Sequence, residues 1–96
     1  MNIEKELSFA VLSGHEFIHG QMDYVAQDES RVILIDFKSD RHAQADQLKT
    51  LYARQISIYQ RCLHQMYPEK QIQAYLYSFD LDQFIEMTPE TELAAA

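Results

Sequence analysis

The chain has 96 residues, of which 47% are hydrophobic and only two are glycine and two proline. This composition predicts one compact domain, residues 1–96, built on one hydrophobic core, and it excludes a disordered tail or linker. No apolar run approaches the roughly 20 residues of a membrane-spanning helix, and no signal-peptide pattern opens the chain, so we expect a cytoplasmic protein without membrane contact. The single cysteine, Cys62, excludes internal disulfides and cysteine metal clusters.

The net charge is −7, and only eight residues are lysine or arginine. Because phosphate contacts come mainly from these two residue types, this balance argues against an extended surface for nucleic acid. Two features would reconcile such a surface with the charge. Bound metal cations would offset part of the negative charge, or neighbouring domains of a larger protein would hold the nucleic-acid strand.

Three strands are expected in the first part of the chain. Leu7 to Leu12 has the composition of an edge strand, and residues 16–26 alternate in polarity, which predicts a strand with one core face and one polar face. The polar segment 27–30 has the length of a hairpin turn. Residues 32–35 form a continuous aliphatic run that is typical of a central strand covered on both faces.

A helix is expected from Ala45 to Met66, with Asp46 as its N-cap and Pro68 as its stop. Apolar residues recur at helical spacing at positions 48, 51, 52, 58, 59, 62, 63 and 66. Gln55 lies within this apolar stripe, so its amide needs a polar partner.

Two further strands are expected near the end of the chain, at residues 71–79 and 84–87, and residues 88–96 are expected to fray. One face of the first of these strands carries three aromatic residues: Tyr75, Tyr77 and Phe79. Alternating aromatics on a strand indicate packing on a sheet face more often than stacking on bases, so we assign them no function.

The main chemical signal lies in the hairpin. If its turn centres near residues 28–29, Asp23 lies opposite or diagonal to Leu34 and Asp36, on the same face as Lys38. Two carboxylates on adjacent strands offer the hard oxygen ligands that Mg²⁺ prefers. A metal there would polarise a phosphoryl oxygen and activate water, while an ammonium stabilises developing negative charge. The competing interpretation is an ordinary charge pair at a strand end, facing solvent.

Three ordered segments carry a family resemblance: GQMD at 20–23, VILIDFKSDR at 32–41 and QISIY at 55–59. Together they resemble the PD-(D/E)xK nuclease superfamily. More narrowly, they look like the C-terminal nuclease domain of AddA and RecB, which belong to bacterial helicase–nuclease complexes that process DNA double-strand ends. The resemblance implies an α/β fold with a restriction-endonuclease-like core, in which the long helix packs on a mixed sheet of four or five strands.

The resemblance also implies roles for individual residues. Asp23 and Asp36 would be metal ligands, joined by the backbone carbonyl of Phe37, and Lys38 would be the catalytic lysine. The implied cofactor is Mg²⁺, with Mn²⁺ as a substitute.

Gln55 and Tyr59 match the family's Q-x-x-x-Y motif, which supports the site or contacts the DNA strand. That match would explain the amide within the apolar stripe, and a buried amide satisfied by backbone groups is the alternative. Asp40 and Arg41 match an extension of the lysine motif, for which a solvated loop is an equal explanation.

One departure concerns the first helix of the family, which carries a histidine of the metal site and which no segment of this chain is expected to form. His15 and His19 do not occupy that helical position and are expected to be partly exposed strand residues. By itself the chain is therefore expected to fold and bind metal weakly, while cutting slowly or not at all.

The leading hypothesis is a Mg²⁺-dependent deoxyribonuclease, an exonuclease domain that is a fragment of an ATP-dependent helicase–nuclease acting in recombinational DNA repair. Its expected partners are DNA, the remainder of the parent helicase chain and a second, AddB-like subunit. The alternative is a non-catalytic interaction or regulatory module that retains the nuclease fold. A metal-free acid–base enzyme using Asp23 and Asp36 has little support, because no sugar-binding or nucleophile motif accompanies the pair.

Overall fold

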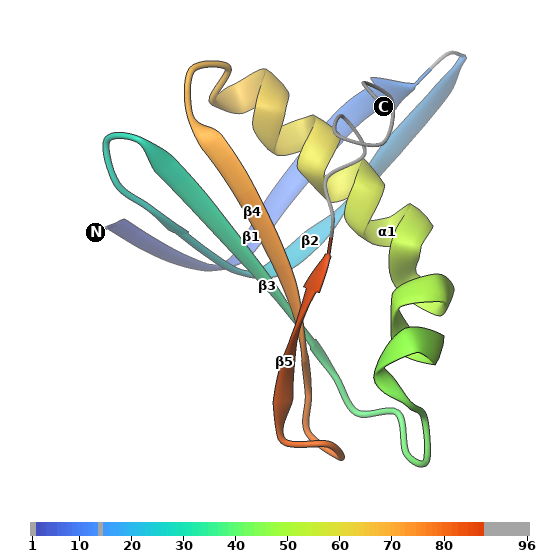
Figure 1. Cartoon of the computed structure of the whole chain (residues 1–96). Coiled ribbons are helices and arrows are strands. Elements are labelled where there is room, and N and C mark those ends of the chain that lie inside the picture. Colours follow the sequence, from blue (N-terminus) through green and yellow to red (C-terminus); the bar gives the residue numbers. More distant parts are fainter. Residues whose placement is uncertain (1, 14, 88–96) are drawn as a thin grey trace, which may run out of the picture.

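The computed structural model describes residues 2–13 and 15–87. Within these residues, five strands form one sheet in the order β1-β2-β3-β4-β5, with one long helix beside it (Figure 1). In chain order the elements are β1 (Asn2–Ser13), β2 (Glu16–Gln27), β3 (Arg31–Lys38), α1 (Ala45–Met66), β4 (Gln71–Ser78) and β5 (Gln83–Met87). The pair β3 and β4 is parallel, and the other neighbouring strands are antiparallel. The expected α/β fold with a mixed sheet and one long helix is confirmed.

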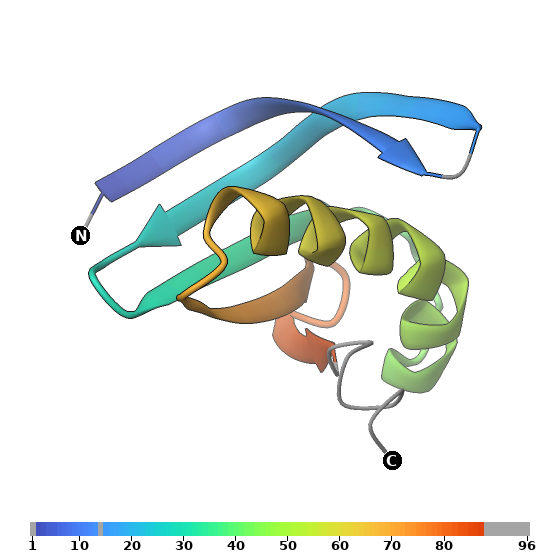
Figure 2. The same cartoon turned by 90° about the horizontal axis from the view of Figure 1, so that it is seen from above.

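Helix α1 is the crossover that the parallel pair of β3 and β4 requires. The sheet curves around it, so that α1 contacts β4 and β5 and also reaches β1 at the opposite edge (Figure 2). On β1, the Phe9 ring packs edge-on against Tyr59 of the helix, with ring centroids 5.1 Å apart. The partner of Phe9 in the sheet is Gly20 on β2, where a Cβ atom would lie only 3.1 Å from the Phe9 ring. Glycine therefore makes room for the ring that reaches the helix.

The hydrophobic core lies between the helix and one face of the sheet. On the two central strands, alternate residues such as Val32, Leu34 and Leu76 are fully buried on this face. Ile33 and Ile35, on the other face of β3, are only partly buried. The prediction that this strand is covered on both faces was therefore too strong, because α1 covers one face of the sheet.

Several helix predictions need correction. The N-cap is Gln44, whose N–H donates to Gln47 Oε1 at 2.7 Å, and Asp46 lies in the first turn, where its charge complements the helix dipole. Leu51 is 63% exposed although the spacing predicts it within the apolar stripe, and Met66 is also exposed. Ile56, which the stripe omitted, is buried instead. The buried face follows the spacing of 48, 56, 59 and 63, and position 51 points away from it.

The strand predictions are correct in order and differ at the ends. β1 is longer than the predicted segment from Leu7 to Leu12, and β3 continues three residues beyond the aliphatic run at 32–35. The other strands differ by one residue at an end. The predicted tail at 88–96 lies outside the described residues. Among the residues that the structure describes, no helix combines the length and the apolar character that crossing a membrane requires.

The aromatic residues of β4 lie on the sheet face away from the helix. There they pack on one another and on neighbours from β3 and β5: Tyr75 and Tyr77 contact Phe84, and Phe79 contacts both Tyr77 and Phe37. The predicted packing on a sheet face is confirmed.

Candidate active site

Asp23, Asp36 and Lys38 meet where β3 ends beside β2. Asp36 is 3% exposed and shares the helix-facing side of β3 with Lys38. Tyr24 on β2 pairs with Ile35 on β3 in antiparallel register. Continuing this register by one residue places Asp23 opposite Asp36. This is the register expected from the sequence.

Asp23 is held against β3 by a hydrogen bond. Its Oδ2 atom accepts from the backbone N–H of Phe37 at 2.9 Å. The Phe37 ring points to the other side of the sheet, where it is 42% exposed and lies against Phe79. The strand thus presents the Phe37 backbone, and not its side chain, to the carboxylates.

The Lys38 ammonium has three close neighbours. Its Nζ atom lies 2.6 Å from Asp36 Oδ2 and donates to Gln55 Oε1 at 2.8 Å. It also lies over the ring of Tyr52, 3.9 Å from the ring centroid. Because only 13% of the lysine side chain is exposed, these contacts replace most of its hydration.

The polar residue in the helix stripe therefore has partners. While Gln55 Oε1 accepts from Lys38, Gln55 Nε2 donates to the Tyr59 hydroxyl at 3.1 Å, and that hydroxyl donates to the backbone carbonyl of Gln21 at 3.1 Å. These partners of the amide are side chains and not the backbone groups of the alternative interpretation. The hydrogen-bonded series connects the lysine to β2 through two residues one helical turn apart.

Burial is the largest influence on the Asp36 carboxyl and raises its pKa. The Lys38 ammonium lowers the pKa, and the nearby Asp23 carboxylate raises it again. Burial and Asp23 together outweigh the lysine. With both carboxylates ionised, the two acids and one ammonium carry a formal charge of −1 in a largely buried space, which favours binding of a further cation.

Asp36 Oδ2 is a buried oxygen of the site. Its close partner is the Lys38 ammonium at 2.6 Å, which uses only part of the hydrogen-bonding capacity of a carboxylate oxygen. A buried carboxylate with unused capacity beside a second carboxylate fits a metal ligand.

A divalent ion fits this donor set. Within residues 2–13 and 15–87, no cluster of three or more His, Cys, Asp or Glu side chains is arranged to hold a metal. The candidate site falls below that number, since its acidic side chains are Asp23 and Asp36. Mg²⁺ matches that set, because it commonly takes one or two protein carboxylates and completes its octahedron with water and substrate phosphate, whereas Zn²⁺ favours several nitrogen or sulfur ligands.

Sequence reasoning missed Tyr52 and left Asp40 undecided. Tyr52 belongs to the predicted apolar stripe, but its hydroxyl donates to Asp40 at 2.8 Å from Oδ1 and 2.9 Å from Oδ2. Loss of hydration and the Asp40 carboxylate both raise the pKa of this hydroxyl, which keeps it a neutral donor. The available signal was spacing, since Tyr52 lies three residues before Gln55 on the same helix face. Arg41, by contrast, is exposed.

His19 lies on β2 as predicted, whereas His15 lies in the turn before β2 and not in a strand. His15 and His19 have exposed side chains, and His19 has the ring of Phe17 as a neighbour. Cys62 is buried on the helix, where loss of hydration raises the pKa of its thiol.

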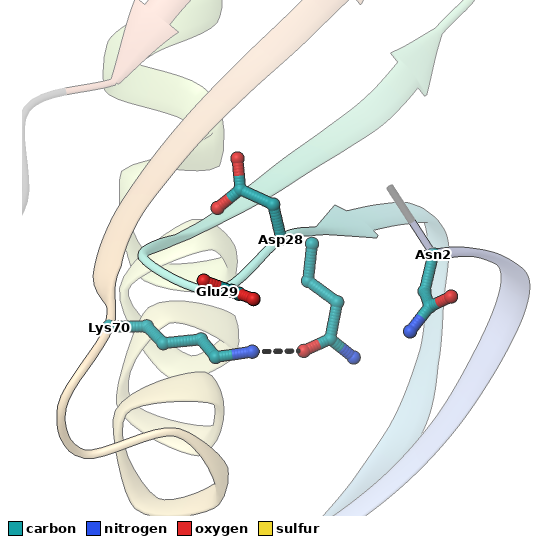
Figure 3. Close-up of a pocket in the computed structure, with 5 residues that line it drawn as sticks. Asn2, Asp28, Glu29 and Lys70 are labelled. Atoms are coloured by element: carbon teal, nitrogen blue, oxygen red, sulfur yellow. Dashed lines mark hydrogen bonds between the residues drawn. The ribbon is translucent and has the colours of Figure 1, made fainter.

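A cavity of about 310 Å³ lies at the start of β3, at the opposite end of that strand from the carboxylates (Figure 3). Lys70 Nζ donates to Gln27 Oε1 at 2.7 Å across it, and Gln27 Nε2 donates to the Tyr67 hydroxyl at 2.9 Å. Because these polar groups satisfy one another, the cavity adds nothing to the candidate active site.

Comparison with known proteins defines the class to which this fold and site belong. The family model described as the PD-(D/E)XK nuclease superfamily matches residues 1–96. The chain therefore belongs to the PD-(D/E)XK nuclease superfamily.

Within that class, the chain is similar to proteins named as subunits of an ATP-dependent helicase/nuclease. It is 36% identical over 73 residues to the protein of Lactiplantibacillus plantarum, covering 76% of this chain and 6% of the relative. It is 34% identical over 80 residues to that of Streptococcus sanguinis, covering 77% of this chain and 6% of the relative. For the Anoxybacillus flavithermus protein the identity is 30% over 88 residues, with 81% of this chain and 7% of the relative covered. The expected resemblance to AddA-like helicase–nucleases is confirmed, and the chain spans only a small part of their length.

Proposed function

We propose that this chain is a metal-dependent deoxyribonuclease that hydrolyses phosphodiester bonds in DNA, with Mg²⁺ as its ion and Mn²⁺ as a substitute. The observation that carries the proposal is the meeting of Asp23, Asp36 and Lys38, in which two carboxylates are neighbours and the buried one is paired with the lysine. Membership in a nuclease superfamily supports the same reaction.

In this proposal Asp23, Asp36 and the backbone carbonyl of Phe37 hold the metal. When bound, the ion supplies Lewis acidity toward a phosphoryl oxygen and lowers the pKa of a bound water. The Lys38 ammonium lies beside Asp36, where it can orient the attacking water and stabilise negative charge that develops on the phosphoryl group.

Gln55 and Tyr59 act through the lysine. The Gln55 amide holds the Lys38 ammonium by its oxygen and the Tyr59 hydroxyl by its nitrogen. Since Tyr59 is in turn bonded to the Gln21 carbonyl, the helix keeps the lysine at a fixed distance from β2, the strand that carries Asp23. Such pre-organisation is what electrostatic stabilisation of a transition state requires.

The wider setting is also part of the proposal. The relatives are named as subunits of an ATP-dependent helicase/nuclease, which supports a role for this chain in such an assembly. We infer further that it is the exonuclease portion, acting on double-strand DNA ends for repair in the cytoplasm beside a second, AddB-like subunit. The remainder of the helicase chain would then hold the DNA. That division explains how a chain with a net charge of −7 works on a polyanion.

The test combines metal binding with cleavage. Mn²⁺ binding is measured by electron paramagnetic resonance, and cleavage of end-labelled single-stranded DNA is followed with Mg²⁺ or Mn²⁺. Asp36→Asn removes a ligand charge and should abolish Mn²⁺ binding at millimolar concentration and lower cleavage roughly a hundredfold. The matched control is Asp46→Asn, an identical change at an exposed position of the first helical turn, which should leave both unchanged. Wild-type cleavage by Asp36→Asn would refute the site.

The same measurements separate the alternative function. The acidic net charge favours a non-catalytic interaction module, because such a module needs no surface for phosphate. Absence of Mn²⁺ binding by the wild-type chain at millimolar concentration would favour that interpretation over the nuclease, whereas slow cleavage by itself would not.

A further inference from the structure

We propose that Tyr52, held by Asp40, is a positioning residue for Lys38, and that its ring supplies the third contact that fixes the ammonium beside Asp36. The proposal rests on the proposed function only for its kinetic consequence. The contact itself is a property of the folded chain and can be tested without metal or DNA.

The ammonium has three N–H groups, and the structure supplies three neighbours. Asp36 Oδ2 and Gln55 Oε1 account for two of them at 2.6 and 2.8 Å. The Tyr52 ring, with its centroid 3.9 Å from Nζ, lies well within the range of a cation–π interaction. The attraction is strongest for a poorly hydrated cation, and the Lys38 side chain is only 13% exposed.

The ring is itself held in place. The Tyr52 hydroxyl donates to both oxygens of Asp40, which lies two residues beyond Lys38 in the segment that leaves β3. That segment is bonded in turn to the connection between β4 and β5, since the N–H of His42 donates to Asp80 Oδ2 at 3.1 Å. Donation to a carboxylate also moves electron density from the hydroxyl into the ring, which strengthens its attraction for a cation. Asp40 therefore affects both the place and the charge distribution of the ring.

The consequence concerns the freedom of the lysine. A lysine side chain has four rotatable bonds and loses much conformational entropy when it is held in one position. Without the ring, Lys38 keeps two contacts and samples more orientations, so fewer molecules have the ammonium in place at the moment of reaction. Because the position of the ammonium affects the transition state more than substrate binding, its loss should lower kcat and change KM little.

The first test is nuclear magnetic resonance of the chain without metal or DNA. Ring current from Tyr52 should move the Lys38 ε-methylene protons upfield of their position in an unfolded chain. In Tyr52→Leu they should return toward that position, and in Tyr52→Phe, which keeps the ring, they should stay upfield. The control is Leu51→Ala, a neighbouring helix residue that is 63% exposed, which should leave the lysine resonance unchanged. A wild-type lysine resonance without an upfield shift would overturn the proposal.

The second test is kinetic, and it varies the electron density of the ring at position 52 while ring size stays nearly constant. Phenylalanine and its mono- and trifluorinated forms are installed at position 52, so that the ring keeps nearly the same shape while its electron density falls. A cation–π contact predicts that kcat decreases steadily with each fluorine, whereas a purely structural ring predicts no trend. Tyr52→Leu should lower kcat about tenfold. The absence of a fluorine trend would refute the positioning role even if Tyr52→Leu fails to fold.

The two tests also separate this proposal from the proposed function. If the Lys38 resonance is shifted as expected but Asp36→Asn cuts DNA like the wild type, the lysine is positioned and the metal site is wrong. If Asp36→Asn is inactive but the lysine resonance is unshifted, the nuclease assignment is supported and the positioning role of Tyr52 is refuted.

Discussion

Replacing Gln55 by leucine tests the hydrogen-bonded series between the helix and β2. The variant keeps a side chain of similar size but loses the bond from Lys38 at 2.8 Å and the bond to Tyr59 at 3.1 Å. Lys38 still has Asp36, and the Tyr59 hydroxyl still has the carbonyl of Gln21, so neither group is left without a partner. The cost should therefore be that of two bonds and not that of an orphaned buried charge.

The magnitude follows from the two bonds. A bond to a charged group contributes roughly 1.5–3 kcal/mol and a neutral one roughly 0.5–1.5 kcal/mol, and the apolar leucine recovers part of the loss by burial. We expect Gln55→Leu to lower the free energy of unfolding by about 2 kcal/mol. Urea denaturation followed by circular dichroism measures this change. The control is Gln65→Leu, the same substitution at an exposed position of α1, which should change stability by less than about 0.5 kcal/mol.

A double-mutant cycle sharpens the test. Tyr59→Phe removes the hydroxyl and with it the bonds to Gln55 and to Gln21. If Gln55 and Tyr59 act as one unit, the two substitutions together should cost less than the sum of the single effects, with a coupling of about 0.5–1 kcal/mol or more. Stability of Gln55→Leu equal to the wild type, or strictly additive effects in the cycle, would refute the coupling that we infer.

Three further outcomes are expected. Gly20→Ala should lower stability by roughly 1 kcal/mol or more, because the new Cβ atom would stand 3.1 Å from the Phe9 ring and displace it; an unchanged melting temperature would contradict this. Two backbone N–H groups of the β2–β3 turn donate to Asp28, which lowers the pKa of its carboxyl from the ordinary 3.8. The stability that this carboxylate contributes is fully present above pH 3.8 and is lost as the pH falls through the lowered pKa, so Asp28→Asn should lose less stability than the wild type between pH 5 and pH 2 in urea unfolding. The Cys62 thiol, buried and with a raised pKa, should react with iodoacetamide only as fast as the chain opens, and rapid labelling of the native chain would contradict that burial.

Local periodicity allowed much of the fold to be predicted. The alternation in β2 and β4 and the helical spacing in α1 identify these elements and most of their buried faces, because side chains repeat every two residues on a strand and every 3.6 on a helix. The same rule places Asp36 and Lys38 on one face of β3, and Gln55 and Tyr59 on one face of the helix. The two-residue error at the N-cap and the exposure of Leu51 lie at the end of the helix and at the margin of its buried face, where the pattern discriminates least.

Periodicity could not identify the partner of each side chain across the sheet. The Phe9 contact with Tyr59 exists because the sheet curves until its edge strand reaches the helix, and that curvature depends on all five strands together. Tyr52 looked like an ordinary core residue for the same reason. The contacts of Tyr52 depend on the tertiary structure: the helix packs with the Tyr52 ring against the Lys38 ammonium, and the loop after β3 places Asp40 beside the Tyr52 hydroxyl.

The sequence by itself thus determined the elements, the faces and the residue types of the candidate site. Those depend on local backbone geometry and on the chemistry of carboxylate, ammonium and amide groups. Only the tertiary structure decided that the Lys38 ammonium is held by Asp36, Gln55 and Tyr52 at once, and that the Asp36 carboxyl is buried beside Asp23. Those facts depend on how closely the helix approaches the sheet, which is set by the packing of the whole core and not by any single segment.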